Sequence, residues 1–332
     1  MNAISVCLYE DRKECFPGVR LLVLSARKHE PTWVFHGVFR NIEATDREWL
    51  KGQPNVILRD ELACGEGGWN VKPALLIKLL QEGLDPVIWC DSDIILSGPV
   101  SGLLEPLDKG RLVATEEHIW GRDKGSESRV GGWGFKPGRK LAGTVNSSFM
   151  RFQSCHLPLL EVWASCLARD EYRQVQQMPW NERPHYFISD QDALTALLGS
   201  EEYVDLEIQL LRNGRDIAQC FEEDGYTALD RLRNAVMGRI PPLIHAQGGK
   251  PWHTGSRANY LQLSPYGPVA VPFLKDAGIP ADWVYPADGY CKFLDRLTFG
   301  SPNLRGWWPA AVRTLNRVRI HLWRLLQPKV HQ

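Results

Sequence analysis

The sequence predicts an α/β fold with one main domain, in which a mixed, mostly parallel sheet carries helices on both faces. The chain has 332 residues, enough to bury one full α/β core and one accessory segment. Its first hundred residues alternate short apolar runs with helical patterns. Beyond about residue 265, proline, glycine and aromatic residues dominate. We therefore expect the main domain over 1–265 and a C-terminal extension over 266–332.

Apolar runs and helical periodicity locate the expected elements along the chain. We expect strands at 4–8, 32–39, 55–58, 86–90, 112–115, 145–152 and 242–245. We expect helices at 17–26, 73–81, 157–168 and 190–198. Proline stands in the first turn of the second helix, where its missing N–H costs nothing. Residues 118–143 hold seven glycines and little periodicity, so we expect a flexible cover near the site or a plain surface insertion there.

Composition narrows the classes of partner and compartment. The 39 basic and 39 acidic residues balance, which argues against capture of nucleic acid by the whole chain. None of the eight cysteines has CxxC spacing, so neither a zinc ribbon nor a redox motif is expected. The first residues lack the pattern of a signal peptide, and no apolar run approaches the ~20 residues that a spanning helix needs. We therefore expect a cytoplasmic protein.

The apolar run that ends at Cys90 is followed by two acids one residue apart, Asp91 and Asp93. Side chains alternate along a strand, so we expect these carboxylates to share a face while Ser92 points away. Two carboxylates at the end of a buried strand are expensive to desolvate unless a cation lies between them. Oxygen-rich sites of this kind suit Mg²⁺ or Mn²⁺, which also hold a substrate's phosphates. The pair therefore indicates a metal-dependent enzyme that acts on a nucleotide diphosphate.

A second motif, IHAQGGKPWH over 244–253, supplies groups that complement the two acids. The neutral imidazole of His245 can join two carboxylates around a metal ion. Gly248 and Gly249 have no Cβ, so the backbone can approach a phosphate closely, and Lys250 adds a compact positive charge. A lone histidine in such a place is more often structural. The matched features around it favour a diphosphate site.

Four motifs in a fixed order give the chain a resemblance to a known family. They are Asp91-Ser92-Asp93, Val145-Asn146-Ser147-Ser148, Asp190-Gln191-Asp192 and the segment 245–252. In this order they resemble the retaining nucleotide-sugar glycosyltransferases of family eight, which include glycogenin and bacterial lipopolysaccharide galactosyl- and glucosyltransferases. The resemblance covers about residues 4–255 and implies a Rossmann-like GT-A fold. It also implies transfer of a hexose from a nucleoside-diphosphate sugar, usually a UDP-sugar, to a hydroxyl of a glycan or glycolipid.

The resemblance implies a role for each matching residue. The implied ligands of Mn²⁺ (or Mg²⁺) are Asp91, Asp93 and His245, with Asp91 also near the ribose. The implied diphosphate ligands are Lys250, Gly248 and Gly249, with Lys72 as a further basic residue beside the donor. The implied residues around the donor sugar are Asn146, Asp190 and Gln191. The alternative for Asp190 is a helix N-cap.

The chain departs from the family's pattern at the end of its first strand. The family commonly has an acidic pair followed by Asn-Tyr near the nucleotide base. Here Tyr9, Glu10 and Asp11 stand as approximate substitutes, and Tyr9 is the residue that we expect beside the base.

The C-terminal extension predicts a surface helix. Residues 301–332 contain six Lys or Arg and no acid, and over about 309–327 the apolar and basic residues fall on opposite sides of a helical wheel. This pattern is typical of a helix that lies on an anionic membrane surface. The alternative is an ordinary terminal helix that docks on the domain. With the family's habits, the pattern favours a peripheral protein on the inner face of the cytoplasmic membrane, acting in lipopolysaccharide or capsule synthesis.

Two other functions share parts of the pattern. A phosphatase of the haloacid-dehalogenase type also has an apolar strand that ends in DxD, but that motif normally stands near the start of its domain, and here about 90 residues precede it. A non-catalytic protein that binds nucleotide sugars would keep the same scaffold.

Overall fold

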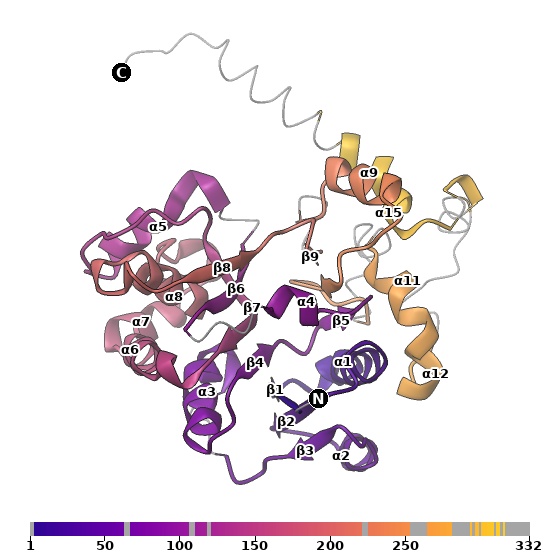
Figure 1. Ribbon diagram of the computed structural model, residues 1–332, viewed down its shortest axis with the longest axis horizontal. Helices are drawn as coiled ribbons and strands as arrows, with labels where there is room; N and C mark the ends of the chain where they lie inside the picture. The colour runs from indigo at the N-terminus through magenta and orange to yellow at the C-terminus, as the bar shows by residue number, and fades with distance from the viewer. Residues whose placement is uncertain are drawn as a thin grey trace.

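The computed structural model describes residues 3–62, 67–105, 110–117, 121–220, 225–252 and 264–280, then 293, 296–298, 300–308, 310–312 and 315 (Figure 1). Its main sheet has seven strands in the order β3-β2-β1-β4-β7-β6-β8. They are β1 Ile4–Glu10, β2 Trp33–Phe39, β3 Val56–Leu58, β4 Val87–Cys90, β6 Leu112–Glu116, β7 Val145–Phe152 and β8 Ile208–Leu211. β7 pairs antiparallel with both neighbours, and the other pairs are parallel. The prediction of a mixed, mostly parallel sheet is confirmed.

Helices cover both faces of this sheet, as Figure 1 shows. They are α1 Phe16–His29 and α2 Ala44–Lys51 on one face, and α3 Lys72–Gln81, α6 Leu157–Leu167 and α8 Asp190–Gly199 on the other. Alternate residues of β1 serve the two layers. Val6 and Leu8 pack in the cluster that contains α1, whereas Cys7 and Tyr9 pack in the cluster that contains α3. The carboxyl ends of β1 and β4 therefore lie at the edge of the sheet, between these two packed layers.

A second sheet of three short strands joins distant parts of the chain. Its order is β5-β10-β9, with β5 Ile94–Leu96, β9 Ile217–Gln219 and β10 Leu243–His245. β10 runs antiparallel to β5, and His245 is paired with Ile94. The Ala246 N–H also donates to the Asp93 carbonyl at 3.0 Å. This pairing fixes the histidine beside the residue that follows the second acid.

The expectation of a flexible cover or surface insertion at 118–143 is wrong over α5, Gly121–Gly132. This helix packs against α8. Its buried residues Ser126, Arg129 and Val130, with Trp133 in the turn that follows, keep helical spacing. Because Ser126 and Arg129 are polar, this period is hidden from a search for apolar residues. The start of the segment, 118–120, lies outside the described residues.

Further elements complete the described chain. They are α4 Ser101–Leu104, α7 Asp170–Gln176, α9 Ala228–Val236, α11 Tyr266–Ala270, α12 Leu274–Ala277 and α15 Pro302–Arg305. α11 and α12 share an apolar cluster with Leu21 and Leu24 of α1. The division of the chain at residue 265 stays a prediction. Most of the predicted helix over 309–327 lies outside the described residues. Within the described part of the chain, no helix combines the length and apolarity needed to cross a membrane.

Candidate functional site

The two acids lie on a turn directly after β4, because the strand ends at Cys90. The Ile94 N–H donates to the Asp91 carbonyl at 3.2 Å and closes this turn. Ser92 points away, as expected, and its hydroxyl donates to Glu10 Oε2 at 2.5 Å. A turn, and not the alternation of strand side chains, therefore brings the two carboxylates to one side.

Asp91, Asp93 and His245 converge. Each offers one ligand atom, and these atoms all lie within 4.8 Å of one another. His245 Nε2 lies 3.2 Å from Asp93 Oδ1, and both side chains are buried. Burial raises the pKa of Asp93, but Lys250 and His245 together hold it well below its usual range, so the carboxylate is ionised.

The same three residues fit a divalent cation. Two carboxylates and an imidazole are a donor set that Mn²⁺ and Mg²⁺ sites use. The buried His245 Nδ1 has no hydrogen-bond partner among the described residues. Buried polar atoms are normally satisfied, so an orphaned nitrogen on this imidazole, whose other nitrogen faces Asp93, fits a ligand at the site.

Lys250 follows the histidine on a glycine turn. Gly248 has a φ of 79°, in the left-handed region that glycine adopts without strain. The Lys250 ammonium is paired with Asp93 Oδ2 and also donates to the Ala246 carbonyl at 2.8 Å. Trp252, two residues on, packs on Gly18 of α1, where a Cβ would lie only 2.7 Å from the indole. The turn that carries Lys250 is therefore anchored by β10 before the lysine and by Trp252 after it.

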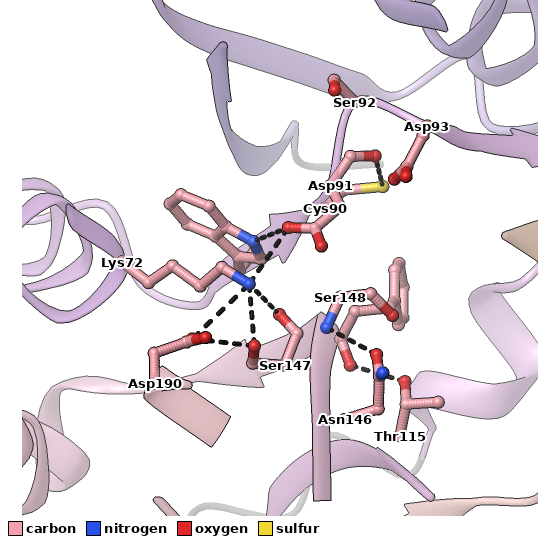
Figure 2. A network of polar contacts seen from close by, with 12 residues as sticks. Lys72, Cys90, Asp91, Ser92, Asp93, Thr115, Asn146, Ser147, Ser148 and Asp190 are labelled. Atoms are coloured by element: carbon pink, nitrogen blue, oxygen red, sulfur yellow. Dashed lines mark hydrogen bonds and ion pairs between the residues drawn. The ribbon is translucent and has the colours of Figure 1, made fainter. Parts of the chain in front are cut away.

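Lys72, the first residue of α3, is the centre of a buried network (Figure 2). Its ammonium lies 3.2 Å from Asp91 Oδ1 and 3.6 Å from Asp190 Oδ2. It also donates to the hydroxyl of Ser147 at 2.7 Å. Burial alone would lower the pKa of Lys72, but Asp190 and Asp91 raise it above its ordinary value. One buried cation thus joins the acid turn to the start of α8.

Asp190 is not the N-cap of its helix. Ser189 takes that place, in a capping box with Asp192, and the structure thereby excludes the alternative considered for Asp190. The Asp190 carboxylate instead accepts from the Ser147 hydroxyl at 2.8 Å and faces Lys72. Burial raises the pKa of Asp190, although Lys72 favours its ionised form.

Glu117 is a site residue that the sequence analysis missed. One oxygen of its buried carboxylate, Oε2, accepts from Asn146 Nδ2 at 2.7 Å and from Gln191 Nε2 at 2.8 Å. These are two of the three residues expected around the donor sugar. A signal was present in the sequence, because Glu117 follows the apolar run of β6 as the acid pair follows that of β4.

Tyr9 lies at the end of β1, where the base was expected. Its hydroxyl donates to Asp11 Oδ2 at 3.0 Å, and the Gly68 N–H donates to the same oxygen at 2.8 Å. Glu10 does not join them, since its buried carboxylate binds Arg12 and Ser92. Of the three substitutes, Tyr9 and Asp11 therefore lie together and Glu10 serves the acid turn.

The arrangement has two chemically distinct parts. One part holds the three candidate metal ligands with Lys250, and the other holds Lys72, Asp190 and the two amides on Glu117. Asp91 belongs to both, since it contacts Lys72 as well. Such a site can bind a ligand with a cation-associated anionic end and a hydroxyl-rich end.

No protein-family model and no curated protein sequence matches the chain. Among solved structures, the chain is similar to galactosyltransferase LgtC in complex with donor and acceptor sugar analogues, at 18% identity and a TM-score of 0.49, over 84% of this chain and 99% of that one. Mouse xyloside xylosyltransferase 1 matches at 15% identity and a TM-score of 0.45, over 74% and 98%. The glycosyltransferase GlyE of Streptococcus pneumoniae TIGR4 matches at 13% identity and a TM-score of 0.45, over 85% and 66%.

Proposed function

We propose that the protein is a metal-dependent glycosyltransferase. It transfers a hexose from a nucleoside-diphosphate sugar, with UDP as the nucleotide, to a hydroxyl of a glycan or glycolipid. The observation that carries this proposal is the convergence of Asp91, Asp93 and His245 beside a lysine on a glycine turn. The sequence resemblance to family eight supports the choice of donor and retention at the anomeric carbon.

The chain's own residues divide the work of binding the donor. Asp91, Asp93 and His245 would hold Mn²⁺ or Mg²⁺, which when bound supplies Lewis-acid stabilisation to the departing diphosphate. Lys250 offers a second positive charge, and Gly248 and Gly249 leave room for backbone contact with phosphate. Tyr9 and Asp11 are the side chains that we assign to the base.

At the sugar end, polar groups are fixed before any ligand binds. Glu117 holds Asn146 and Gln191 by their NH₂ groups. Asn146 Oδ1 accepts from the Ser148 N–H at 3.0 Å, so the amide oxygen of Gln191 is the one left for a ligand. Lys72 keeps Asp91 and Asp190 together. Groups preorganised in this way stabilise developing charge without reorganisation during the reaction.

Binding and turnover of nucleotide sugars test the proposal. A thermal-shift screen of UDP-hexoses should show that the preferred donor stabilises the protein only when Mn²⁺ or Mg²⁺ is present. A ligand at 100 times its Kd stabilises the folded protein by about 2.7 kcal/mol, which such a screen detects. Asp93→Asn should abolish the metal-dependent part, whereas Asp205→Asn, on the exposed surface, should keep it.

Three outcomes would contradict the assignment. If Asp93→Asn retains metal-dependent turnover at a near-normal rate, the assignment of the metal site is wrong. Release of phosphate from a simple phosphate monoester, without transfer to a sugar, would favour a haloacid-dehalogenase-type phosphatase. Donor binding with neither transfer nor hydrolysis would favour a non-catalytic binding protein.

We also propose that the protein docks on the inner face of the cytoplasmic membrane, with residues 266–332 as an extension for this purpose. The basic residues over 301–332 support an anionic surface as the partner. α9 adds support, since Leu229 and Val236 on its outer face are 75% and 80% exposed while Arg231 and Asn234 face inward. Trp308 and Leu315, which follow α15, are also exposed, and α15 packs on α9.

A further inference from the structure

Two exposed tryptophans from different segments meet beside the candidate site. Trp69 lies in the 3₁₀ helix Gly68–Val71 and Trp180 in the 3₁₀ helix Trp180–Glu182. Their ring centroids are 6.3 Å apart with an interplanar angle of 74°. They are 44% and 48% exposed, in contrast to the fully buried Trp33 and Trp163. Exposed indoles that form a pair are typical of a binding surface.

The segment that carries Trp69 is anchored in the core. The next residue, Asn70, accepts through Oδ1 a hydrogen bond of 2.9 Å from the hydroxyl of Tyr172, a fully buried residue of α7. The indole of Trp69 itself stays partly exposed, with ring surface for another contact.

Trp180 is fixed by an arginine. The Arg183 guanidinium lies 5.7 Å from the centre of the Trp180 ring. Arg183 also donates to the carbonyls of Gln176, Met178 and Ile188. These bonds close the loop that carries the tryptophan, so its ring is preorganised.

Both segments lead directly into the sugar end of the site. Trp69 stands three residues before Lys72, so their Cα atoms lie at most about 11 Å apart. The loop of Trp180 ends at Ile188, two residues before Asp190. Lys72 and Asp190 face each other at 3.6 Å. The tryptophan pair therefore borders the part of the site assigned to the donor sugar.

We infer that Trp69 and Trp180 form the platform on which the acceptor saccharide rests. The inference depends on the proposed function, because it takes the acceptor to be a glycan. Indoles provide large, rigid contact areas that also accept polar neighbours, which suits the apolar C–H face and the hydroxyl rim of a pyranose. A platform at the rim presents one hydroxyl of the bound sugar toward the donor.

Saturation-transfer NMR without donor or metal tests the platform directly. The probes are methyl β-D-galactopyranoside, methyl β-D-glucopyranoside and lactose, with UMP as a nucleotide probe. At least one saccharide should receive saturation from the native chain. Its affinity should fall about tenfold, or roughly 1.4 kcal/mol, in Trp69→Ala and in Trp180→Ala. Trp69→Phe and Trp180→Phe should retain most of the binding, and Val204→Ala, an exposed apolar control, should change nothing.

The platform is overturned if no saccharide receives saturation, if saturation persists in both alanine variants, or if these variants lose only the UMP signal. Circular dichroism checks that each variant is folded. The proposed function fails separately. If the native chain shows no metal-dependent donor binding but saccharide contact still depends on the two tryptophans, the transferase is rejected and a saccharide-binding site remains. If donor binding is metal-dependent as expected but saccharide contact is unchanged by substitution of the two tryptophans, only the platform is rejected.

Discussion

At the residue scale, one carboxylate oxygen of Glu117 orients both Asn146 and Gln191. Replacing Glu117 with Gln keeps its size but removes the charge, and hydrogen bonds to charged groups contribute about 1.5–3 kcal/mol. We therefore expect Glu117→Gln to lower kcat roughly 10- to 100-fold, with a small effect on the Kd for UDP. Steady-state transfer kinetics and calorimetric titration of UDP measure the two quantities.

The neighbouring acid provides the matched control for this substitution. Glu116 is the last residue of β6 and contacts neither amide. Glu116→Gln should keep kcat within about twofold. A Glu117→Gln variant with nearly unchanged kcat would show that the two amides do not depend on this carboxylate.

At the element scale, a buried ion pair joins α5 to α8. Arg129 Nε lies 2.6 Å from Asp192 Oδ1, and both side chains are almost fully buried. Burial raises the pKa of Asp192 from its ordinary 3.8 to about 6, although Arg129 opposes this. The folded chain therefore binds a proton here more readily than the unfolded chain does.

This raised pKa predicts a pH dependence of stability. The contribution of Asp192 is fully present below about pH 4 and is lost as the pH rises through about 6. A difference of about two pKa units corresponds to roughly 3 kcal/mol. In urea denaturation from pH 4 to 7, the native chain should lose stability of this order relative to the Asp192→Asn variant.

Asp192→Asn should lack this fall, although its loss of the partner of Arg129 lowers its stability at every pH. Asp205→Asn, which changes an exposed acid, should retain the native profile. If Asp192→Asn and the native chain show parallel pH profiles, Asp192 does not titrate in this range.

At the scale of the whole molecule, the membrane contact that we propose includes the outward apolar face of α9 and the exposed side chains of Trp308 and Leu315. Burying a large aliphatic side chain contributes about 1.5–3 kcal/mol, so changing Leu229 and Val236 together to Glu should weaken binding to anionic vesicles at least tenfold. Vesicle co-sedimentation measures this effect. Binding should also fall with added salt.

The catalytic site should not respond to this double substitution. Nucleotide-sugar binding should stay unchanged in the variant, because neither residue contacts the site described above. Val204→Glu, an exposed apolar position in another part of the chain, serves as the control and should bind vesicles normally. Equal vesicle binding by all three proteins would exclude the α9 face as a membrane contact.

The sequence by itself determined the α/β class, six of the seven strands of the main sheet, and most residue types of the site. These features are local, since period, capping residues and motif spacing are written in consecutive positions. The helix α5 was not predicted from the sequence because two of its buried positions are polar. Strands β5 and β8 were also missed, since three or four residues carry little pattern, although the equally short β3 and β10 were predicted.

Only the tertiary structure decided which of these residues meet. His245 reaches Asp93 because β10 pairs with β5, a backbone contact between segments about 150 residues apart. Glu117 holds Asn146 and Gln191, and Trp69 meets Trp180, through similar long-range packing. Such contacts depend on strand register and on how layers pack, and these are properties of the folded whole that no single segment encodes.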